Sequence, residues 1–324
     1  MGTGAVQARR EIEAPVRELV RATVLPALGL AGRAFELAIP PLGRSSLVFL
    51  VEVEGAPGFV VRVAQAARGR RDLRRRLRSG RFWSERGLPT PRVLHADLAR
   101  ATRRRAGFWL LCEARIRGHN LVGPAARVAD FAAAGRAFAR IHAVERRWHH
   151  GSFYQPRVGY FGYRLVKRHG EWTRALAGLG LVEAGATRAH RDWLGRFPTL
   201  HRGGPFQLIH RRCTESDVMV DEAGEAWVLE PQRCGFGSFL TDLVRIEERV
   251  CAEDPGRVAA FHAGYFGAVA AERRAQYDAL APVFRADLHL SNALRWARKL
   301  AEGQAEAEPE FMRELDRFRK ITGV

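Results

Sequence analysis

Lysine is almost absent from this sequence. Of its 53 basic residues only three are lysine (Lys167, Lys299 and Lys320), and the others are arginines spread along the whole chain. The 53 basic residues outnumber the 35 acidic residues, which gives a net charge of +18. Such a charge is typical of proteins that bind nucleic acid or anionic surfaces. A general preference for arginine over lysine produces the same charge, and the even spread favours this compositional explanation, so nucleic acid is the less favoured partner.

The chain also lacks the features of metal-cluster, membrane and secreted proteins. Its four cysteines show no C-x-x-C spacing, and no histidines gather beside them in a zinc-type pattern. No apolar run reaches about 18 residues, so we expect no transmembrane helix. The first twenty residues have no apolar core of the kind found in secretion signals. These absences indicate a reduced, cytoplasmic protein without a cysteine-bound metal.

The order of apolar patterns predicts a β-rich first part and a helical second part. An amphipathic segment is followed by "SLVFLVEVE" and "FVVRVA", two β-rich runs joined by "GAPG", which is a hairpin signature. An arginine-rich helix that ends before Pro89 and a strand over 108–114 come next. We therefore expect an N-terminal helix (1–30), a β-rich lobe with one long helix (31–114), a helical lobe (115–302) and a polar tail (303–324) that is loosely attached.

One stretch of the second part has the shape of an active site. "QLIHRRCTESDVMVDEAGEAWVLEPQR" reads as two short apolar runs around a polar loop, with a carboxylate after each run. We expect a β-hairpin over 206–230. The helix before it, "ARVADFAAAGRAFARIHAVE", carries Phe131, Gly135, Phe138 and His142 at spacings of three to four, and everything after Thr241 reads as helical.

The order of these motifs resembles the aminoglycoside phosphotransferase and choline kinase-like family. The similar stretches are "FWSERGLPTPRVL", "GRAFARIHAV", "LIH…DVMVD…WVLE", "DLVRI" and "FHAGYF". The "HRR" and "EPQR" spellings are also similar to the related lipopolysaccharide core kinases. The resemblance spans 37–300. It implies an α+β, two-lobed protein kinase-like fold, with a β-rich N-lobe and a mainly helical C-lobe that holds a small catalytic β-hairpin.

The resemblance implies ATP and Mg²⁺ as cofactors, and it assigns positions to the groups that would bind them. Gly43, Ser45 and Ser46 stand in the hairpin that would cover the phosphates. Glu113 stands where the family joins its lobes and binds adenine through the backbone. An ordinary turn explains the first three residues equally well.

Two further carboxylates stand at the metal-binding positions of this family. Asp217 replaces the family asparagine and Glu230 replaces the family aspartate, and both offer the oxygen ligands that suit Mg²⁺. The other interpretation is a pair of solvent-exposed strand ends, where acidic residues are common. Asp242 matches an aspartate that braces the catalytic loop, which is a structural role.

Three further positions depart from the family pattern. Arg62 stands in place of the lysine that grips the phosphates, and arginine is not an equivalent grip. Arg76 stands near the glutamate that would hold this lysine, so we expect the two arginines to repel each other. Arg212, two residues after His210, occupies the place of the catalytic aspartate, and a guanidinium cannot act as the base.

The three departures together predict a pseudokinase that has lost ordinary catalysis and that keeps a binding or regulatory role, either with Mg²⁺ and ATP or without them. The first alternative is an active ATP-dependent phosphotransferase with unusual groups, acting on a sugar, a glycolipid or another small hydroxyl compound. The second is a basic protein that binds nucleic acid or anionic surfaces. The aromatic and basic segment over 148–204 would suit an anionic or sugar-like ligand, but such a mixture is also common on plain helical surfaces.

Overall fold

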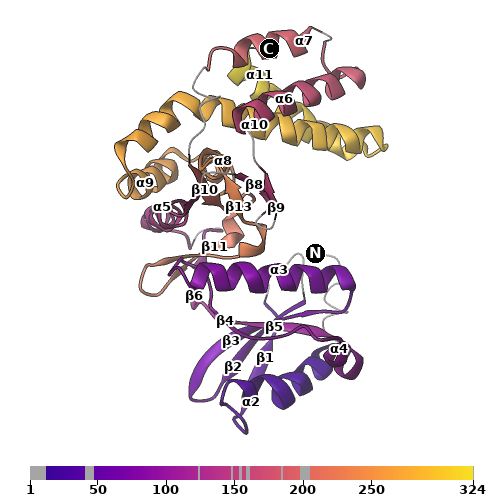
Figure 1. The fold of residues 1–324 in the computed structure, drawn as a ribbon, viewed down its shortest axis with the longest axis vertical. Helices are drawn as coiled ribbons and strands as arrows, with labels where there is room; N and C mark the ends of the chain where they lie inside the picture. Colours follow the sequence, from indigo (N-terminus) through magenta and orange to yellow (C-terminus); the bar gives the residue numbers. More distant parts are fainter. Residues whose placement is uncertain are drawn as a thin grey trace. The chain divides into compact units, whose positions relative to one another are not determined.

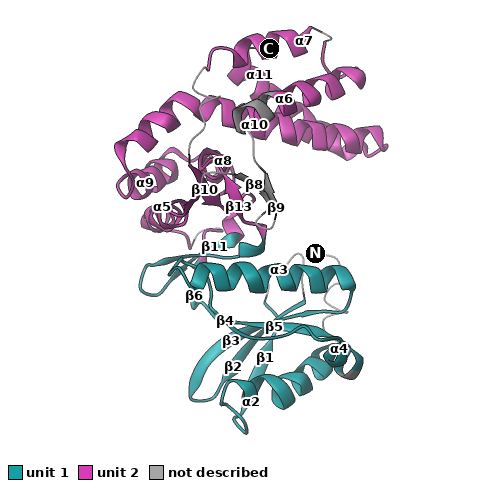
Figure 2. Ribbon diagram, in the orientation of Figure 1, with its two compact units in different colours: residues 1–119, 217–232 teal, residues 120–216, 233–324 magenta. Residues whose placement is uncertain are grey.

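The computed structural model describes residues 12–40, 47–122, 125–146, 149–152, 155–157, 161–183, 185–197 and 205–323. The chain forms two compact units (Figure 2). The first unit comprises residues 1–119 and 217–232, and the second comprises residues 120–216 and 233–324. The predicted order of a β-rich part and then a helical part is confirmed (Figure 1).

An antiparallel sheet of five strands, in the order β1-β2-β3-β5-β4, forms the centre of the first unit. Its strands are β1 (Phe35–Ala38), β2 (Leu47–Val53), β3 (Ala56–Ala64), β4 (Val93–Asp97) and β5 (Trp109–Ala114). The expected hairpin is β2–β3, and Gly55 turns the chain with a positive φ of 64° that glycine adopts without strain. Side chains alternate between the two faces of each strand, so each face is covered separately.

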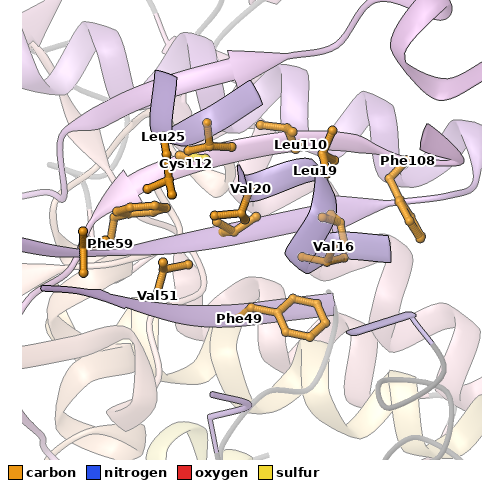
Figure 3. Packing of buried hydrophobic residues seen from close by; sticks show 14 residues of the cluster. Val16, Leu19, Val20, Leu25, Phe49, Val51, Phe59, Phe108, Leu110 and Cys112 are labelled. Carbon is orange, nitrogen blue, oxygen red and sulfur yellow. The ribbon is translucent and has the colours of Figure 1, made fainter. Parts of the chain in front are cut away.

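The N-terminal helical segment covers one face of this sheet. Residues 12–19 are helical and continue through a π-helical turn (Val20–Val24) into α2 (Leu25–Ala27). Val16, Val20 and Leu25 are buried against side chains of the sheet, including Phe49 and Phe59 (Figure 3). The apolar residues of the amphipathic pattern that predicted this helix are therefore the ones that pack into the core of the first unit.

Helix α3 (Ala67–Ser84) covers the other face, and the short helix α4 (Arg100–Ala106) precedes β5. Leu73 of α3 is buried with Trp109 and Leu111 of β5. A second small sheet in the order β12-β11-β6 is formed by β6 (Gly118–Asn120), β11 (Val218–Asp221) and β12 (Ala226–Val228).

Residues 217–232, which hold the β11–β12 hairpin, belong to the first unit, whereas the prediction placed a hairpin over 206–230 in the helical lobe. A main-chain hydrogen bond explains part of the difference, because Val228 N–H donates to the Pro89 carbonyl at 2.7 Å. Long-range contacts of this kind leave no periodic signal in a sequence.

The second unit is mainly helical, as predicted. Its helices are α5 (Val128–His142), α6 (Phe161–Gly178), α7 (Ala186–Leu194), α8 (Leu240–Arg249), α9 (Pro255–Phe266), α10 (Ala271–Ala301) and α11 (Glu308–Thr322). Its strands are β7 (Glu145–Arg146), β8 (His149–Ser152), β9 (Gln155–Arg157), β10 (Phe206–Ile209) and β13 (Gly235–Gly237). Among the described residues, 3₁₀ turns cover Glu215–Asp217 and Pro231–Arg233, at the two boundaries between the units, and Ala305–Ala307 in the second unit. Strand β10 lies between β13 and β7, and it leads directly into His210.

The C-terminal residues differ from the loosely attached tail that we expected. Residues 308–322 form α11, which buries Phe311, Leu315 and Phe318. These apolar residues recur at helical spacing, and their burial outweighs the acidic, polar character of the segment. Among the described helices, none is long and apolar enough to cross a membrane.

Candidate functional site

Four charged side chains of the first unit form the Arg–Glu cluster, in which Arg76 and Glu113 are buried and Arg62 and Glu230 are partly buried. Arg62 on β3 is paired with Leu111 on β5, so it shares one sheet face with Glu113 two residues further on. Helix α3 covers this face and contributes Arg76, and Glu230 follows β12. All four residues belong to the first unit, and 168 positions of sequence separate the outermost two, since 230 − 62 = 168.

Glu113 joins the two arginines at the centre of the cluster. Its two carboxylate oxygens accept separate hydrogen bonds, from Arg62 Nε at 2.9 Å and from Arg76 Nε at 2.6 Å. The side chains of Glu113 and Arg76 are each only 3% exposed. Charge-assisted bonds in such a dry environment are strong, so Glu113 fixes both guanidinium groups on this face of the sheet.

Glu230 is held by the same two arginines from the other side. Its Oε1 lies 2.7 Å from Arg76 Nη1 and 3.4 Å from Arg62 Nη1. Its Oε2 accepts a hydrogen bond from the side-chain amide of Gln232. The backbone of Glu230 has a positive φ of 58°, which is uncommon for a residue other than glycine. Both carboxylate oxygens are therefore engaged by donors of the chain itself.

The charges of the cluster stabilise one another in their ionised forms. Burial alone would lower the pKa of Arg76, but the Glu113 and Glu230 carboxylates outweigh it, so the pKa of Arg76 is raised. Burial alone would raise the pKa of Glu113, but Arg76 and Arg62 outweigh it, so the pKa of Glu113 is lowered. Two guanidinium and two carboxylate groups give a net charge of zero. The repulsion that we expected between the two arginines is offset because the carboxylates lie between them.

The sequence did not reveal the partner role of Glu113, although one signal for Arg76 was present. Arg76 follows the buried Leu73 by three positions and precedes the buried Trp83 by seven, so it lies on the apolar stripe of α3. A charged residue at such a position needs a partner of opposite charge. No sequence spacing points from there to a residue on a distant strand.

The residues at the expected metal position do not fit a divalent cation. The guanidinium groups of Arg62 and Arg76 lie against Glu230 at the distances given above, and they would repel a cation bound to its oxygens. Asp217, the other expected ligand, is buried at the end of the Glu215–Asp217 turn. In the described ranges no group of three or more histidine, cysteine, aspartate or glutamate side chains is placed to hold a metal ion.

The phosphate-covering residues of the prediction, Gly43, Ser45 and Ser46, lie outside the described residues. His210, Arg212 and Asp242 belong to the second unit, whereas Asp217 belongs to the first. The structure therefore brings together Arg62, Glu113 and Glu230 within one unit, and His210 and Asp242 within the other.

In the second unit, Asp242 fixes the backbone of the loop that follows β10. Its two carboxylate oxygens accept hydrogen bonds from the main-chain N–H groups of His210, at 2.5 Å, and Arg211, at 2.7 Å. Arg211 has a positive φ of 76°, which is a strained conformation for arginine. The side chain of Asp242 is fully buried in the first turn of α8, so it holds this loop in one conformation.

A buried histidine in turn orients Asp242. His142 lies 3.3 Å from the Asp242 carboxylate through Nε2 and 2.9 Å from the Tyr265 hydroxyl through Nδ1. Burial lowers the pKa of His142, and the pKa of Asp242 is also lowered because its hydrogen bond with His142 and the nearby charges outweigh burial. A neutral His142 that donates from Nε2 to a charged Asp242 and accepts from Tyr265 satisfies all three groups.

The side chain of Arg212, in the same loop, is exposed. A guanidinium stays protonated at any ordinary pH, and it offers donors without an acceptor. Arg212 therefore has no capacity to accept a proton from a hydroxyl group.

The comparisons with known proteins agree with this architecture. Residues 36–282 match the model of the phosphotransferase enzyme family. Aminoglycoside phosphotransferase APH(4)-Ia, solved as a thermostable mutant with ADP and hygromycin B, is 16% identical, with a TM-score of 0.57, over 92% of this chain and 98% of that chain. A choline/ethanolamine kinase family protein from Mesorhizobium loti is 17% identical, with a TM-score of 0.56, over 95% and 98% of the two chains.

Spectinomycin phosphotransferase APH(9)-Ia, solved with ADP and spectinomycin, is 10% identical, with a TM-score of 0.54, over 94% of this chain and 93% of that chain. A search of the curated proteins finds no match. At identities this low, the structural similarity establishes the fold alone. It is the predicted protein kinase-like fold, with an antiparallel sheet followed by helices. The match to the family model covers about three quarters of the sequence, and the chain therefore belongs to the phosphotransferase enzyme family.

Proposed function

We propose that this member of the family is a pseudokinase, a kinase-like fold that serves a binding or regulatory role without Mg²⁺-dependent phosphoryl transfer. The observation that carries the proposal is the state of Glu230, whose carboxylate is bound by Arg62, Arg76 and Gln232. The two guanidinium groups on this carboxylate oppose the binding of a metal ion to its oxygens.

The second support is the absence of a base at the position of Arg212. A general base in the transition state typically contributes about 100- to 10,000-fold to the rate. The lysine that would grip the phosphates is also replaced, by Arg62, which is bonded to Glu113. These losses affect three different functions of the family site, so a single compensating group would not restore them.

A binding role is favoured by one unsatisfied donor in the Arg–Glu cluster. Nη2 of Arg76 is buried and has no hydrogen-bond partner among the described residues. A buried guanidinium N–H without an acceptor is unfavourable, and an oxygen of a bound nucleotide or of another anionic or sugar-like ligand would satisfy it. The proposed ligand is therefore a small molecule with an acceptor group.

The alternative is an active ATP-dependent phosphotransferase with unusual groups, acting on a sugar, a glycolipid or another small hydroxyl compound. The similarity of "HRR" and "EPQR" to lipopolysaccharide core kinases favours a sugar-type acceptor. In this alternative Asp217 and Glu230 would hold the cation, and Arg62 and Arg212 would bind phosphate groups. Catalysis would then depend on positioning and electrostatics alone.

Thermal unfolding separates the two functions. The melting temperature is measured alone, with ATP and EDTA, and with ATP and Mg²⁺, in the wild type and in Glu230→Ala and Asp217→Ala. The proposal predicts no stabilisation that requires Mg²⁺. A Mg²⁺-dependent stabilisation that both substitutions abolish would support the alternative, and transfer of labelled phosphate to any acceptor would overturn the proposal.

A further inference from the structure

Helix α3 gathers arginines on its exposed face. Eight of its 18 residues are arginine, and Asp72 is its one acidic residue. Six of these arginines are exposed on the side of the helix away from its buried residues. We call this surface the α3 arginine face, and it consists of Arg68, Arg71, Arg74, Arg75, Arg78 and Arg81. At about 1.5 Å per residue the helix is roughly 27 Å long, so this face is an extended row of positive charge.

The positive surface continues onto the neighbouring helix α4. Arg70 donates two hydrogen bonds to the Leu98 carbonyl just before α4, at 3.0 and 2.7 Å. The pKa of Arg70 is lowered by desolvation and by the positive charges of Arg74 and Arg100. Arg100, Arg103 and Arg104 of α4 are exposed. All these residues belong to the first unit, so the surface does not depend on the second.

This arrangement is unfavourable for the helix itself. Arg71 has arginines three and four positions ahead of it, and like charges at these spacings destabilise a helix. The first turn carries Arg68 and Arg70 and no acidic residue, which opposes the helix dipole. A general preference for arginine explains why these residues are not lysine. It does not explain why six arginines and only one acidic residue, Asp72, are exposed on this helix.

We infer that the α3 arginine face binds the phosphodiester backbone of nucleic acid without regard to base sequence. Guanidinium groups bind phosphate oxygens in a forked geometry, and an extended row of them matches an extended row of phosphates. An anionic membrane fits less well, because interfacial helices combine their basic residues with an apolar face. The exposed large apolar side chains of the described residues are Val122, Val128, Leu179 and Met312, and none lies on α3.

A matched pair of double substitutions tests this inference. Arg71→Gln with Arg74→Gln removes two charges of the α3 arginine face, and Arg295→Gln with Arg298→Gln removes two exposed arginines at the same spacing on α10. Binding of a short fluorescent DNA duplex is measured by anisotropy at several salt concentrations. If four phosphates are contacted, the wild-type affinity falls about 100-fold between roughly 50 and 200 mM salt.

The α3 variant is expected to bind about tenfold more weakly at low salt and to reduce the salt slope by about two. The α10 variant is expected to match the wild type, and equal circular dichroism melting curves would show that all three proteins fold. Equal losses in both variants would overturn the inference, because the binding would then follow net charge. So would a wild type that binds no duplex, or binding through α3 to phosphatidylserine vesicles in place of DNA.

Discussion

At the residue scale, Glu113 compensates the positive charges of Arg62 and Arg76 inside the first unit. It is the group to which Arg62 and Arg76 both donate, and it is almost fully buried. A buried ion pair adds little net stability relative to an apolar pair, but removing one partner leaves an uncompensated charge. The cluster is therefore sensitive to loss of any member, and loss of Glu113 removes a carboxylate partner from both Arg62 and Arg76.

Replacement of Glu113 by glutamine is expected to destabilise the protein by about 3–5 kcal/mol, because Arg76 would retain only Glu230 as a carboxylate partner. The free energy of unfolding is obtained from urea titration. Glu36→Gln, at an exposed position of β1, is the control and should change stability by less than about 0.5 kcal/mol. Equal stabilities of the two variants would show that the cluster does not form as described.

A second residue-scale prediction concerns a buried histidine pair of the second unit. Nδ1 of His169 lies 2.8 Å from Nε2 of His190, and Nε2 of His169 lies 2.8 Å from the Asp287 carboxylate, which also accepts from Arg168. Because His169 donates to Asp287, its Nδ1 accepts from His190. Burial, followed by the electrostatic effect of His169, lowers the pKa of His190 to about 3.

A histidine whose pKa is lower in the folded state opposes folding when it is protonated. Stability from His190 is therefore complete above its unfolded pKa of about 6.5 and is lost as the pH falls toward 3. Between pH 7 and 5 the wild type should lose up to about 2 kcal/mol more than His190→Phe. Urea unfolding at several pH values measures this difference, and parallel pH profiles of the two proteins would contradict it. His289, whose pKa is raised, is common to both.

At the element scale, helices α5 and α9 approach so closely that only glycine fits at their crossing. A Cβ atom on Gly135 would lie 2.2 Å from the Phe261 carbonyl oxygen and 2.7 Å from the Tyr265 amide nitrogen. Both obstacles are backbone atoms, so a side chain could be accommodated only by moving a helix. The same helices carry His142 and Tyr265, which orient Asp242.

Gly135→Ala is therefore expected to destabilise the protein by at least about 1–3 kcal/mol, the usual cost of overpacking. Gly170→Ala is the matched control, because Gly170 lies within α6 and has no atom within 4 Å of a built Cβ. It should stabilise the helix by up to about 1 kcal/mol. Thermal melting gives both values, and destabilisation of equal size in the two variants would remove the explanation by close contact.

The elements were largely predictable and their partners were not. Alternation and helical spacing predicted β2, β3, α3 and α5, because each pattern reports local burial. The same spacing was present in α11 through Phe311, Leu315 and Phe318, but its acidic composition led us to expect a loose tail. The ion pairs of Arg76 with Glu113 and Glu230 join segments that are distant in the sequence, so no local sequence pattern predicts them.

At the scale of the whole molecule, the chain combines a family fold with a buried site that is neutral overall and a surface that is strongly basic. The +18 charge is carried almost entirely by arginine, yet the arginines serve different purposes. Arg62 and Arg76 are bonded inside the first unit, whereas those of the α3 arginine face point to solvent. Composition alone therefore did not separate the arginines that are paired inside the first unit from those that are exposed.

Whether Glu230 binds a divalent cation is the most direct test of the proposed pseudokinase. Mn²⁺ replaces Mg²⁺ in electron paramagnetic resonance, where protein-bound Mn²⁺ loses the sharp signal of the free ion. We expect the wild-type protein to leave the signal as strong as in a matched solution without protein, both alone and with ATP present. A loss of signal in the wild type that Glu230→Ala abolishes would contradict it, because Glu230 would then hold the metal despite Arg62 and Arg76.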